Sequence, residues 1–369
     1  MKKLCFIINH ISSGAGTERV AINIINGLAE RGHDITLVTL WNSGESFFEL
    51  NERVRTISLF EEKLPLYRNY LKLVLAIRRF LKDGNFDIVV NIETMLTLLV
   101  SPAVRGLGIA HVNWEHYNFT ASSDSMLRPV ARYVAAWTAT AVVTLTEADT
   151  RMWQNRTRPR ARMKTINNPL PFRKPDYHYH PDSRVVLAVG RLFHQKGFDL
   201  LLQTWHQVIG KHPDWTLQIV GSGEEEQALK AQARELTIED SVEFHPHTKN
   251  IEAFYDQAGI FCLSSRFEGF GMVLIEAAAH GVPLASFDCL AGPAEIIDDE
   301  HNGLLAEAEN TQALAEILER LMSDESLRSS YSRRAYDSID RFKPEIILPK
   351  WEALFEELSM TTSSTCRTD

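Results

Sequence analysis

Cysteine is scarce in this sequence, and its apolar runs are short. The 369 residues include four cysteines, at Cys5, Cys262, Cys289 and Cys366, and no two of them form a Cys-x-x-Cys pair. This pattern favours reduced thiols in a cytosol over a disulfide framework. The first apolar run, Leu4–Ile8, stops at Asn9, which is too short for the core of a signal peptide or for a membrane span. We therefore predict a cytoplasmic protein.

Several motifs that mark enzyme classes are also missing. No two aspartates are separated by a single residue, so the chain has no Asp-x-Asp element of the kind that holds a metal and a sugar nucleotide. No Gly-x-Ser-x-Gly turn supports a serine hydrolase. The pairs His178/His180 and His245/His247 each offer at most two metal ligands, and exposed loop histidines are the plainer interpretation. The sequence predicts neither a metal site nor a cofactor.

Charge is unevenly divided along the chain. The net charge is −9, yet residues 1–172 carry 21 Lys and Arg against 15 Asp and Glu, whereas the remainder carries 18 against 33. A basic half without a nucleic-acid-binding motif is a poor case for DNA or RNA, and it suits an anionic acceptor or an anionic membrane surface better. Tyr67–Lys82 is typical of a basic amphipathic helix, although such a helix usually packs on its own sheet. We predict loose, peripheral attachment to the inner face of a membrane and no nucleic-acid partner.

Length and pattern indicate two α/β domains. A chain of 369 residues exceeds the ~100–200 residues of a usual domain. Short β-branched runs alternate with helical patterns in both halves, which is typical of parallel sheets. Strands are predicted at residues 4–8, 35–40, 56–59, 88–92, 109–113, 141–146, 185–189, 215–220, 242–244, 260–263 and 283–287. Four prolines between residues 168 and 181 prevent a helix or a central strand from continuing there, so they mark a linker.

These patterns define a domain organisation. We predict a Rossmann-like N-terminal domain over residues 1–172 and a second Rossmann-like domain over 173–343. A helix over 344–358 is expected to return to the N-terminal domain, and a disordered tail is expected over 359–369. Because open parallel sheets bind ligands at the carboxyl ends of their strands, the two domains are expected to face each other across a cleft.

A short turn after the strand at 185–189 carries two cations. Gly190 begins this turn, and Arg191 and Lys196 stand five apart before Gly197. Two cations at the end of a strand can stabilise a diphosphate leaving group, because negative charge accumulates on that group as its bond to a sugar breaks. Solvated surface charge is the alternative for any single Arg or Lys. We place Arg191 and Lys196 among the catalytic residues and Gly190 in the donor site.

Two glutamates follow the strand at 260–263. Glu268 lies in the loop, and Glu276 lies in a helix predicted over 272–280 that starts just after two glycines. Backbone N–H groups and the helix dipole at such a start favour a phosphate. One carboxylate can accept hydrogen bonds from vicinal ribose hydroxyls, and the other can orient sugar hydroxyls. We predict that Glu268 is catalytic and that the donor is bound by Ser265, Gly269, Phe270, Gly271 and Glu276.

The first half contributes a glycine-containing loop and a histidine. Gly14 and Gly16 precede the first predicted helix, but Arg19 stands where a dinucleotide-binding fingerprint has its third glycine, so an NAD site is not predicted. Gly16 and Thr17 are instead expected to contact a diphosphate or a sugar. His116 follows the strand at 109–113, where a hydrogen-bonded structural histidine and a catalytic one are equally good interpretations. We include His116 among the catalytic candidates.

The order and spacing of these motifs resemble those of the retaining GT-B glycosyltransferases of family 4, which build bacterial polysaccharides and lipid-linked glycans. The resemblance covers nearly the whole chain. It rests on Ile166–Pro169, Gly190–Gly197, Val220–Gly223, Ser265–Glu276, Gly281–Pro283, Gly292–Ile297 and Asn302–Leu304. The sequence departs from the family in one place: two adjacent glycines usually precede Ala-Glu-Arg, whereas here Gly16 is followed by Thr17.

The resemblance implies a GT-B fold and a retaining, metal-independent transfer reaction. In that fold, residues 1–172 would form the acceptor-side domain and residues 173–343 the nucleotide-sugar-binding domain. The donor would be a nucleotide-diphosphate sugar, with UDP the favoured nucleotide and a hexose or N-acetylhexosamine the transferred group. The acceptor would be a glycan or a polyprenyl-diphosphate-linked glycan in surface polysaccharide synthesis. By the resemblance, Arg191 and Lys196 would contact the donor diphosphate, and Gly16 would belong to a loop over the phosphates. Glu276 would contact the ribose and Glu268 the transferred sugar. His116 would lie beside the donor sugar.

Two other functions stay open at the level of sequence. One is a sugar-nucleotide epimerase or phosphorylase on the same architecture, since a fold does not determine a reaction. The other is a non-catalytic nucleotide-sugar-binding subunit, against which the complete set of Arg191, Lys196, Glu268 and Glu276 argues.

Overall fold

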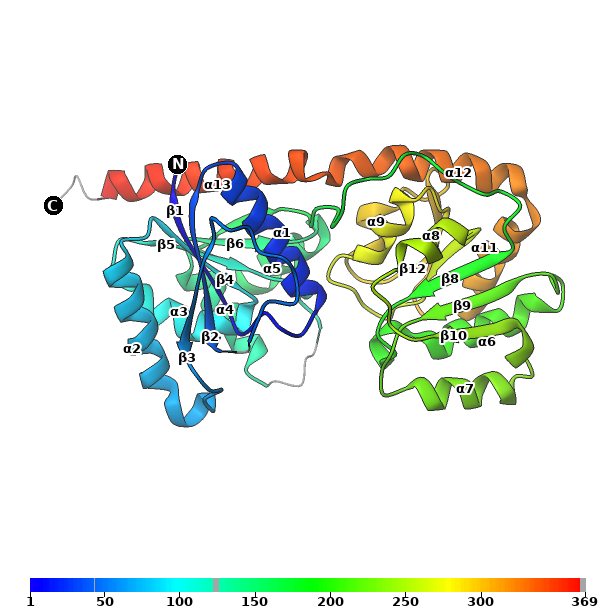
Figure 1. Cartoon of the computed structure of the whole chain (residues 1–369), viewed down its shortest axis with the longest axis horizontal. Helices are drawn as coiled ribbons and strands as arrows, with labels where there is room; N and C mark the ends of the chain where they lie inside the picture. Colours follow the sequence, from blue (N-terminus) through cyan, green and yellow to red (C-terminus); the bar gives the residue numbers. More distant parts are fainter. Residues whose placement is uncertain (43, 122–125, 366–369) are drawn as a thin grey trace. The chain divides into compact units, whose positions relative to one another are not determined.

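The chain is divided into two compact units (Figure 1). The computed structural model describes residues 1–42, 44–121 and 126–365, with side chains through residue 360. The first unit comprises Met1–Pro171 together with Pro344–Asp369, and the second comprises Phe172–Lys343. The chain therefore leaves the first unit once and returns to it through its last helix.

The first unit is built on a seven-stranded parallel sheet. Its strands are β1 (Lys3–Ile8), β2 (Asp34–Trp41), β3 (Arg55–Phe60), β4 (Ile88–Ile92), β5 (Ala110–Trp114), β6 (Ala141–Thr144) and β7 (Arg162–Thr165). They lie in the order β3-β2-β1-β4-β5-β6-β7. The chain thus extends the sheet outward in two directions from the junction of β1 and β4.

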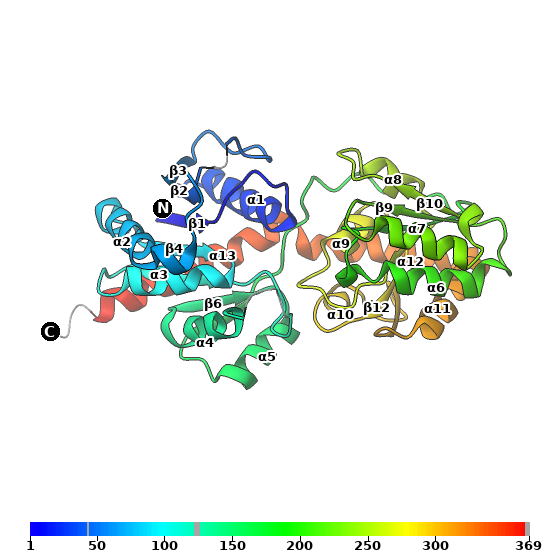
Figure 2. The same ribbon diagram turned by 90° about the horizontal axis from the view of Figure 1, so that it is seen from below.

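Helices cover this sheet because its central strands, β1 and β4 among them, are buried on both sides. The helices are α1 (Gly16–Glu30), α2 (Leu66–Gly84), α3 (Thr97–Val104), α4 (Arg128–Thr138), α5 (Glu147–Thr157) and α13 (Pro344–Thr365), with a 3₁₀ turn at Thr94–Leu96. Helices α2, α3 and α4 are neighbours, as are α1 and α13 (Figure 2). Cys5, Ile7 and Val89 alternate along their strands to one side, where they join the apolar faces of α2 and α3 in one core. The alternate residues Leu4 and Phe6 are equally buried.

The last helix, α13, packs on the first unit through aromatic side chains. The Trp351 ring is fully buried, and its centroid lies 4.7 Å from that of Trp114 in β5. The sequence analysis predicted a helix ending at residue 358 and a disordered tail from 359. That boundary is wrong, because α13 continues through Thr365. Buried Phe355 and Leu358 carry the apolar face to the predicted end, and neither Gly nor Pro follows them to stop the helix. Residues 366–369, Cys366 among them, lie outside the described part.

The second unit repeats the same plan with a six-stranded parallel sheet. Its strands are β8 (Val185–Val189), β9 (Thr216–Val220), β10 (Val242–His245), β11 (Ile260–Leu263), β12 (Leu284–Asp288) and β13 (Gly303–Glu307). They lie in the order β10-β9-β8-β11-β12-β13. Its helices are α6 (Phe198–Ile209), α7 (Glu226–Glu235), α8 (Glu252–Gln257), α9 (Met272–Ala279), α10 (Pro293–Ile296), α11 (Thr311–Ser323) and α12 (Glu325–Ser338), with 3₁₀ turns at His194–Lys196, Glu239–Ser241 and Ile339–Phe342.

Two parallel sheets flanked by helices confirm the α/β fold class. Each predicted strand segment corresponds to an observed strand, with ends that shift by one or two residues. The sequence analysis missed the edge strands β7 and β13. Strand β7 (Arg-Met-Lys-Thr) is too polar to be recognised as a strand, and β13 begins at a glycine, a residue that weakens a strand pattern.

The strand order places one ligand-binding position in each unit. In a doubly wound sheet, ligands bind beyond the carboxyl ends of the strands where the order reverses. These strands are β1 and β4 in the first unit and β8 and β11 in the second. The loops after β8 and β11 carry two of the motifs that the sequence analysis selected, and the loop after β1 leads to a third, at Gly16 and Thr17.

We predict that Trp351→Ala destabilises the first unit by about 3–5 kcal/mol, because it leaves a large cavity against Trp114 and Phe355. Urea unfolding followed by far-UV circular dichroism measures the change. Lys350→Ala, at an exposed neighbouring position of the same helix, is the control and should leave the transition in place. An unchanged transition for Trp351→Ala would show that α13 does not support the sheet.

Candidate active site

The turn that begins at Gly190 is held against the loop after β9 by close backbone contacts. A Cβ on Gly221 would lie 1.8 Å from the Gly190 carbonyl oxygen, and a Cβ on Gly223 would lie 2.3 Å from the Leu192 carbonyl oxygen. The Leu192 N–H donates to the Ser222 carbonyl at 3.0 Å. Only glycine allows backbones to approach so closely. The Gly-Ser-Gly sequence after β9 therefore determines the path of the turn after β8.

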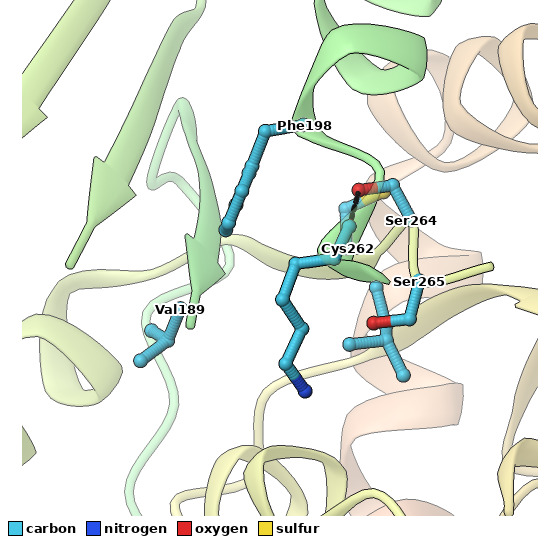
Figure 3. Close-up of a pocket in the computed structure, with 7 residues that line it drawn as sticks. Val189, Phe198, Cys262, Ser264 and Ser265 are labelled. Atoms are coloured by element: carbon cyan, nitrogen blue, oxygen red, sulfur yellow. Dashed lines mark hydrogen bonds between the residues drawn. The ribbon is translucent and has the colours of Figure 1, made fainter. Parts of the chain in front are cut away.

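A second set of contacts joins this turn to the loop after β11. Gly197 has a φ of 63°, and a Cβ there would lie 2.1 Å from the Ser264 carbonyl oxygen. The Ser264 hydroxyl donates to the Lys196 carbonyl at 3.0 Å, the contact drawn in Figure 3. The Arg266 N–H donates to the Gln195 carbonyl at 2.9 Å. The two loops selected from the sequence are thus one structural element.

Lys196, Glu268 and Ser265 form a polar cluster at this junction. Lys196 Nζ lies 2.7 Å from Glu268 Oε1, and the Ser265 hydroxyl donates to the same oxygen at 2.7 Å. The side chains of Lys196 and Glu268 are 18% and 8% exposed. Water screens such a pair weakly, and removing either partner would leave the other charge buried without compensation. The structure therefore brings together two of the predicted catalytic residues and one predicted donor contact.

A small recess lies beside the cluster. It is lined by Val189, Lys196, Phe198, Cys262, Leu263, Ser264 and Ser265. Figure 3 shows the Phe198 ring and the Val189 side chain on one side of it and Ser264 and Ser265 on the other. Burial raises the pKa of the Cys262 thiol to about 12, so this thiol stays protonated and packs as an apolar group.

Arg191 stands apart from this cluster. Its side chain is exposed, and its guanidinium carbon lies 5.1 Å from the centroid of the Phe193 ring. The sequence analysis predicted that Arg191 and Lys196 stabilise the same diphosphate, which stays a prediction. The contacts of the described side chains place Lys196 on Glu268 and Arg191 over Phe193. An exposed guanidinium on the same turn remains accessible to an anion.

The start of α9 is shaped by glycines. Gly271 caps the helix with a φ of 94°, and Gly269 lies in the loop just before it. Gly292, with a φ of 117°, allows the next loop to approach the Phe270 carbonyl, from which a Cβ would be 2.8 Å away. The buried Phe270 ring packs edge-on against Phe342 at 5.4 Å. We therefore expect the backbone of Phe270, and not its ring, to face a ligand.

Glu276 lies in the second turn of α9 and is 5% exposed. Its Oε2 accepts a hydrogen bond from the Tyr255 hydroxyl at 3.0 Å. Tyr255 comes from α8, so the carboxylate is held by a separate element. The sequence analysis missed this partner because nothing in the local pattern around Tyr255 shows which helix it faces.

In the first unit, Gly16 and Thr17 belong to the first turn of α1. The sequence analysis placed them before the helix, but the helix begins five residues earlier than its apolar pattern, which starts at Ala21. Buried Glu18 organises the preceding loop by accepting from the Ser13 N–H at 3.1 Å, the Gly14 N–H at 3.0 Å and the Ser13 hydroxyl at 2.5 Å. Glu18 is a residue that the sequence analysis did not select.

His116 follows β5 and is 9% exposed. Burial lowers the pKa of His116 to about 3, so the ring is neutral at physiological pH. Its ring lies 4.5 Å from that of Trp114. Within the described part of the chain, no hydrogen-bond partner reaches the buried His116 Nε2. Buried polar atoms are usually hydrogen-bonded, and a ligand hydroxyl is one group that can satisfy this atom.

Fully buried Glu115 holds the loop that carries His116. Its Oε1 accepts from the backbone N–H groups of His116 and Tyr117 at 3.0 and 3.1 Å, and its Oε2 accepts from the Thr94 hydroxyl at 2.9 Å. Arg132 approaches the same carboxylate at 3.5 Å. The position of His116 is therefore determined by a charged side chain that the sequence analysis passed over.

The end of β4 contributes a strained residue to the same region. Glu93 has a φ of 86°, a conformation that residues other than glycine rarely adopt. Its carboxylate lies 2.6 Å from Arg128 Nη2, and Arg128 lies over the Tyr117 ring. Burial, opposed by Arg128, raises the pKa of Glu93. Burial and the neighbouring Glu115 raise the pKa of Asp149 to about 7.

The described residues hold neither a metal-binding cluster nor a membrane-spanning helix. They contain no group of three or more His, Cys, Asp or Glu side chains that could hold a metal ion. None of their helices has the length and apolar character that crossing a bilayer requires.

Two doubly wound α/β units in one chain give the fold of the GT-B glycosyltransferases. The fold matches Staphylococcus aureus TarM, solved with UDP among its ligands, with a TM-score of 0.81 and 15% identity, covering 96% of this chain and 100% of that one. It also matches Anabaena HepE in complex with UDP, with a TM-score of 0.78 and 18% identity, covering 96% and 100%.

Sequence comparisons identify the family. Residues 14–174 match Glycosyltransferase Family 4, and residues 173–338 match Glycosyl transferases group 1. An uncharacterized glycosyltransferase of Haemophilus influenzae is 33% identical, covering 96% of this chain and all of that protein. The amylovoran biosynthesis glycosyltransferase AmsD of Erwinia amylovora is 30% identical, covering 95% and 99%. An undecaprenol-diphosphate-glycan α-1,4-N-acetyl-D-galactosaminyltransferase of Campylobacter jejuni is 27% identical, covering 97% and 99%.

The chain therefore belongs to the family 4 (group 1) glycosyltransferases, and it is an enzyme that transfers a sugar. This confirms the family predicted from the sequence and favours a transferase over the epimerase and phosphorylase alternatives.

Proposed function

We propose that this glycosyltransferase moves a hexose or N-acetylhexosamine from a nucleotide-diphosphate sugar, with UDP the nucleotide, to a glycan or polyprenyl-diphosphate-linked acceptor in bacterial surface polysaccharide synthesis. The reaction is retaining and needs no metal. The observation that carries the proposal is the Lys196–Glu268 pair at 2.7 Å, located where the loops after β8 and β11 join. UDP in the solved TarM and HepE complexes and the acceptor named for the Campylobacter relative support the choice of substrates.

The donor's diphosphate is assigned to the cations of the turn after β8. As the bond from the anomeric carbon to the phosphate oxygen breaks, its electron pair leaves with the diphosphate, and Lys196 and Arg191 stabilise the added charge. The N-terminal turns of α1, with Gly16 and Thr17, and of α9, after Gly271, offer backbone N–H groups to phosphate oxygens. These cations and N–H groups stabilise the charge of the leaving diphosphate without a metal ion.

Glutamates and a neutral histidine are assigned to the sugars. Glu276 binds the ribose hydroxyls, and Glu268 orients the transferred sugar and offsets positive charge on its ring. His116, neutral because burial lowers its pKa to about 3, hydrogen-bonds the donor sugar through Nε2. A departing phosphate oxygen takes the proton of the acceptor hydroxyl as the new bond forms on the same face, so the anomeric configuration is retained.

The acceptor side is assigned to the first unit, whose α2 suits an anionic membrane. Three large apolar side chains recur every four residues on its outer face: Tyr67, Leu71 and Leu75 are 77%, 72% and 63% exposed. Exposed Arg68 and Lys72 flank them. Apolar insertion combined with cations is the pattern of helices that lie on anionic bilayers. We propose that α2 attaches the enzyme loosely to the inner face of the membrane that carries its acceptor.

Substitution of the two glutamates should affect different kinetic constants. We expect Glu268→Gln to lower kcat by roughly 10²-fold with little change in donor KM, because the carboxylate acts on charge that develops only in the transition state. We expect Glu276→Gln to raise donor KM by roughly tenfold, because it weakens hydrogen bonds already made in the ground state. The donor for these assays is chosen by thermal shift among UDP-, GDP- and ADP-sugars.

Glu239→Gln, at an exposed position of the second unit, is the control for these kinetics and should leave both constants unchanged. Normal turnover by Glu268→Gln would remove Glu268 from the reaction. Equal changes in kcat and KM for the two variants would contradict the division of roles.

The stereochemistry of the product tests the mechanism. NMR of the first-formed product should show the same anomeric configuration as the donor sugar, because bond breaking and bond making take place on one face. An inverted product would overturn the retaining mechanism and would require a general base on the opposite face.

Membrane attachment is testable with vesicles. The full-length protein should co-sediment with phosphatidylglycerol-containing vesicles at low salt and be released as screening increases. Leu71→Ser together with Leu75→Ser should weaken binding, whereas Ile346→Ser, at an exposed apolar position of α13 (48%), should not. A protein that ignores anionic vesicles at low salt and glycosylates a soluble sugar equally well would contradict the proposal.

A further inference from the structure

A chain of side-chain contacts reaches Glu276 from α8 and from the end of α9. Tyr255 is 1% exposed, and its hydroxyl donates to Glu276 Oε2 at 3.0 Å. The Tyr255 ring stacks on the His280 ring, with centroids 5.4 Å apart and planes inclined by 28°. His280 is 4% exposed, and its Nδ1 lies 2.7 Å from Asp256 Oδ1. The chain therefore runs from Asp256, whose side chain is 51% exposed, to the buried carboxylate.

The Tyr255 hydroxyl has a specific task at this position. A buried ring could pack on His280 and Phe261 without a hydroxyl, as a phenylalanine would. A buried hydroxyl is costly unless it is hydrogen-bonded, and this one is directed at a carboxylate. A carboxylate has about four acceptor positions, so the bond to Oε2 leaves capacity for other donors while it restricts rotation of the side chain.

Restricting Glu276 before a ligand arrives has a consequence for binding. A glutamate side chain has several rotatable bonds, and ordering it opposes binding unless the order already exists. Aromatic stacking on His280 holds the tyrosine, and the Asp256 carboxylate holds the histidine. The orientation of Glu276 is thus established by the fold of the second unit.

We propose that Tyr255 is a positioning residue that orients Glu276 toward the ribose hydroxyls of the nucleotide and so makes the enzyme selective for ribonucleotides. His280 and Asp256 support it from behind. The inference rests on the proposed function, in which Glu276 contacts the ribose. Tyr255 would then determine nucleotide specificity without contacting the nucleotide itself, because it acts through Glu276.

The test compares nucleotides that differ only in the hydroxyls Glu276 would bind. Calorimetry on the full-length protein gives Kd for the tightest-binding nucleotide among UDP, GDP and ADP and for its 2′,3′-dideoxy counterpart. The wild type should bind the ribonucleotide at least about tenfold more tightly. Tyr255→Phe should weaken ribonucleotide binding by about tenfold, leave dideoxynucleotide binding nearly unchanged, and so bring the ratio of the two Kd values close to one.

Matched variants separate the possible outcomes. Tyr179→Phe removes a hydroxyl of the same unit that donates to the Gly259 carbonyl at 3.0 Å, so it should keep the wild-type ratio. Glu276→Gln should bring the ratio of the two Kd values close to one. Tyr255→Phe added to Glu276→Gln should weaken ribonucleotide binding no further. If Glu276→Gln keeps the ratio, the ribose contact of the proposed function is wrong. If Glu276→Gln brings the ratio close to one and Tyr255→Phe does not, the positioning role of Tyr255 is overturned while the proposed function stands.

Discussion

The close packing of the loops after β8 and β11, which brings Lys196 and Glu268 into a part-buried ion pair, is the constraint on which the second unit's site depends. The two charges of the pair come from loops that follow different strands, and each would be costly to bury without the other. The pair therefore requires both loops to be held in one relative position, and the backbone supplies that constraint. A Cβ at Gly197 would collide with the Ser264 carbonyl, and one at Gly221 would collide with the Gly190 carbonyl. Glycine makes this close packing of loops possible, and the ion pair is its chemical result.

Buried carboxylates that accept hydrogen bonds from the protein lie near the strand ends of both units. Glu18 and Glu115 in the first unit accept backbone N–H groups of the loops they hold, and Glu276 in the second accepts the Tyr255 hydroxyl. Each carboxylate has lost most of its hydration, so it needs hydrogen bonds from the protein. These bonds order the loops before a substrate is present. Such order favours catalysis, because dipoles and charges that are already oriented need not reorganise during the reaction.

Much of the fold could be predicted because the relevant signals are local. The strands β8 and β11 are short apolar runs, and the loops after them carry glycines and charges in a recognisable order. Edge strands were missed because β7 is polar and half-solvated, so its sequence lacks the apolar pattern of a central strand. Tyr255 was missed for a different reason. A single tyrosine in a short helix looks the same whether it faces solvent, a core or a carboxylate from another helix.

The sequence by itself determined the α/β class, the order of the motifs and the resemblance to family 4, because glycine positions, apolar periodicity and loop charges are encoded residue by residue. Only the tertiary structure decided which charges meet. It paired Lys196 with Glu268 and placed Arg191 over Phe193, although the two cations lie on one turn. It also gave Glu276 its tyrosine partner and left His116 neutral. The physical reason is that burial and pairing depend on the path of the backbone through space, and residues far apart in sequence set that path together.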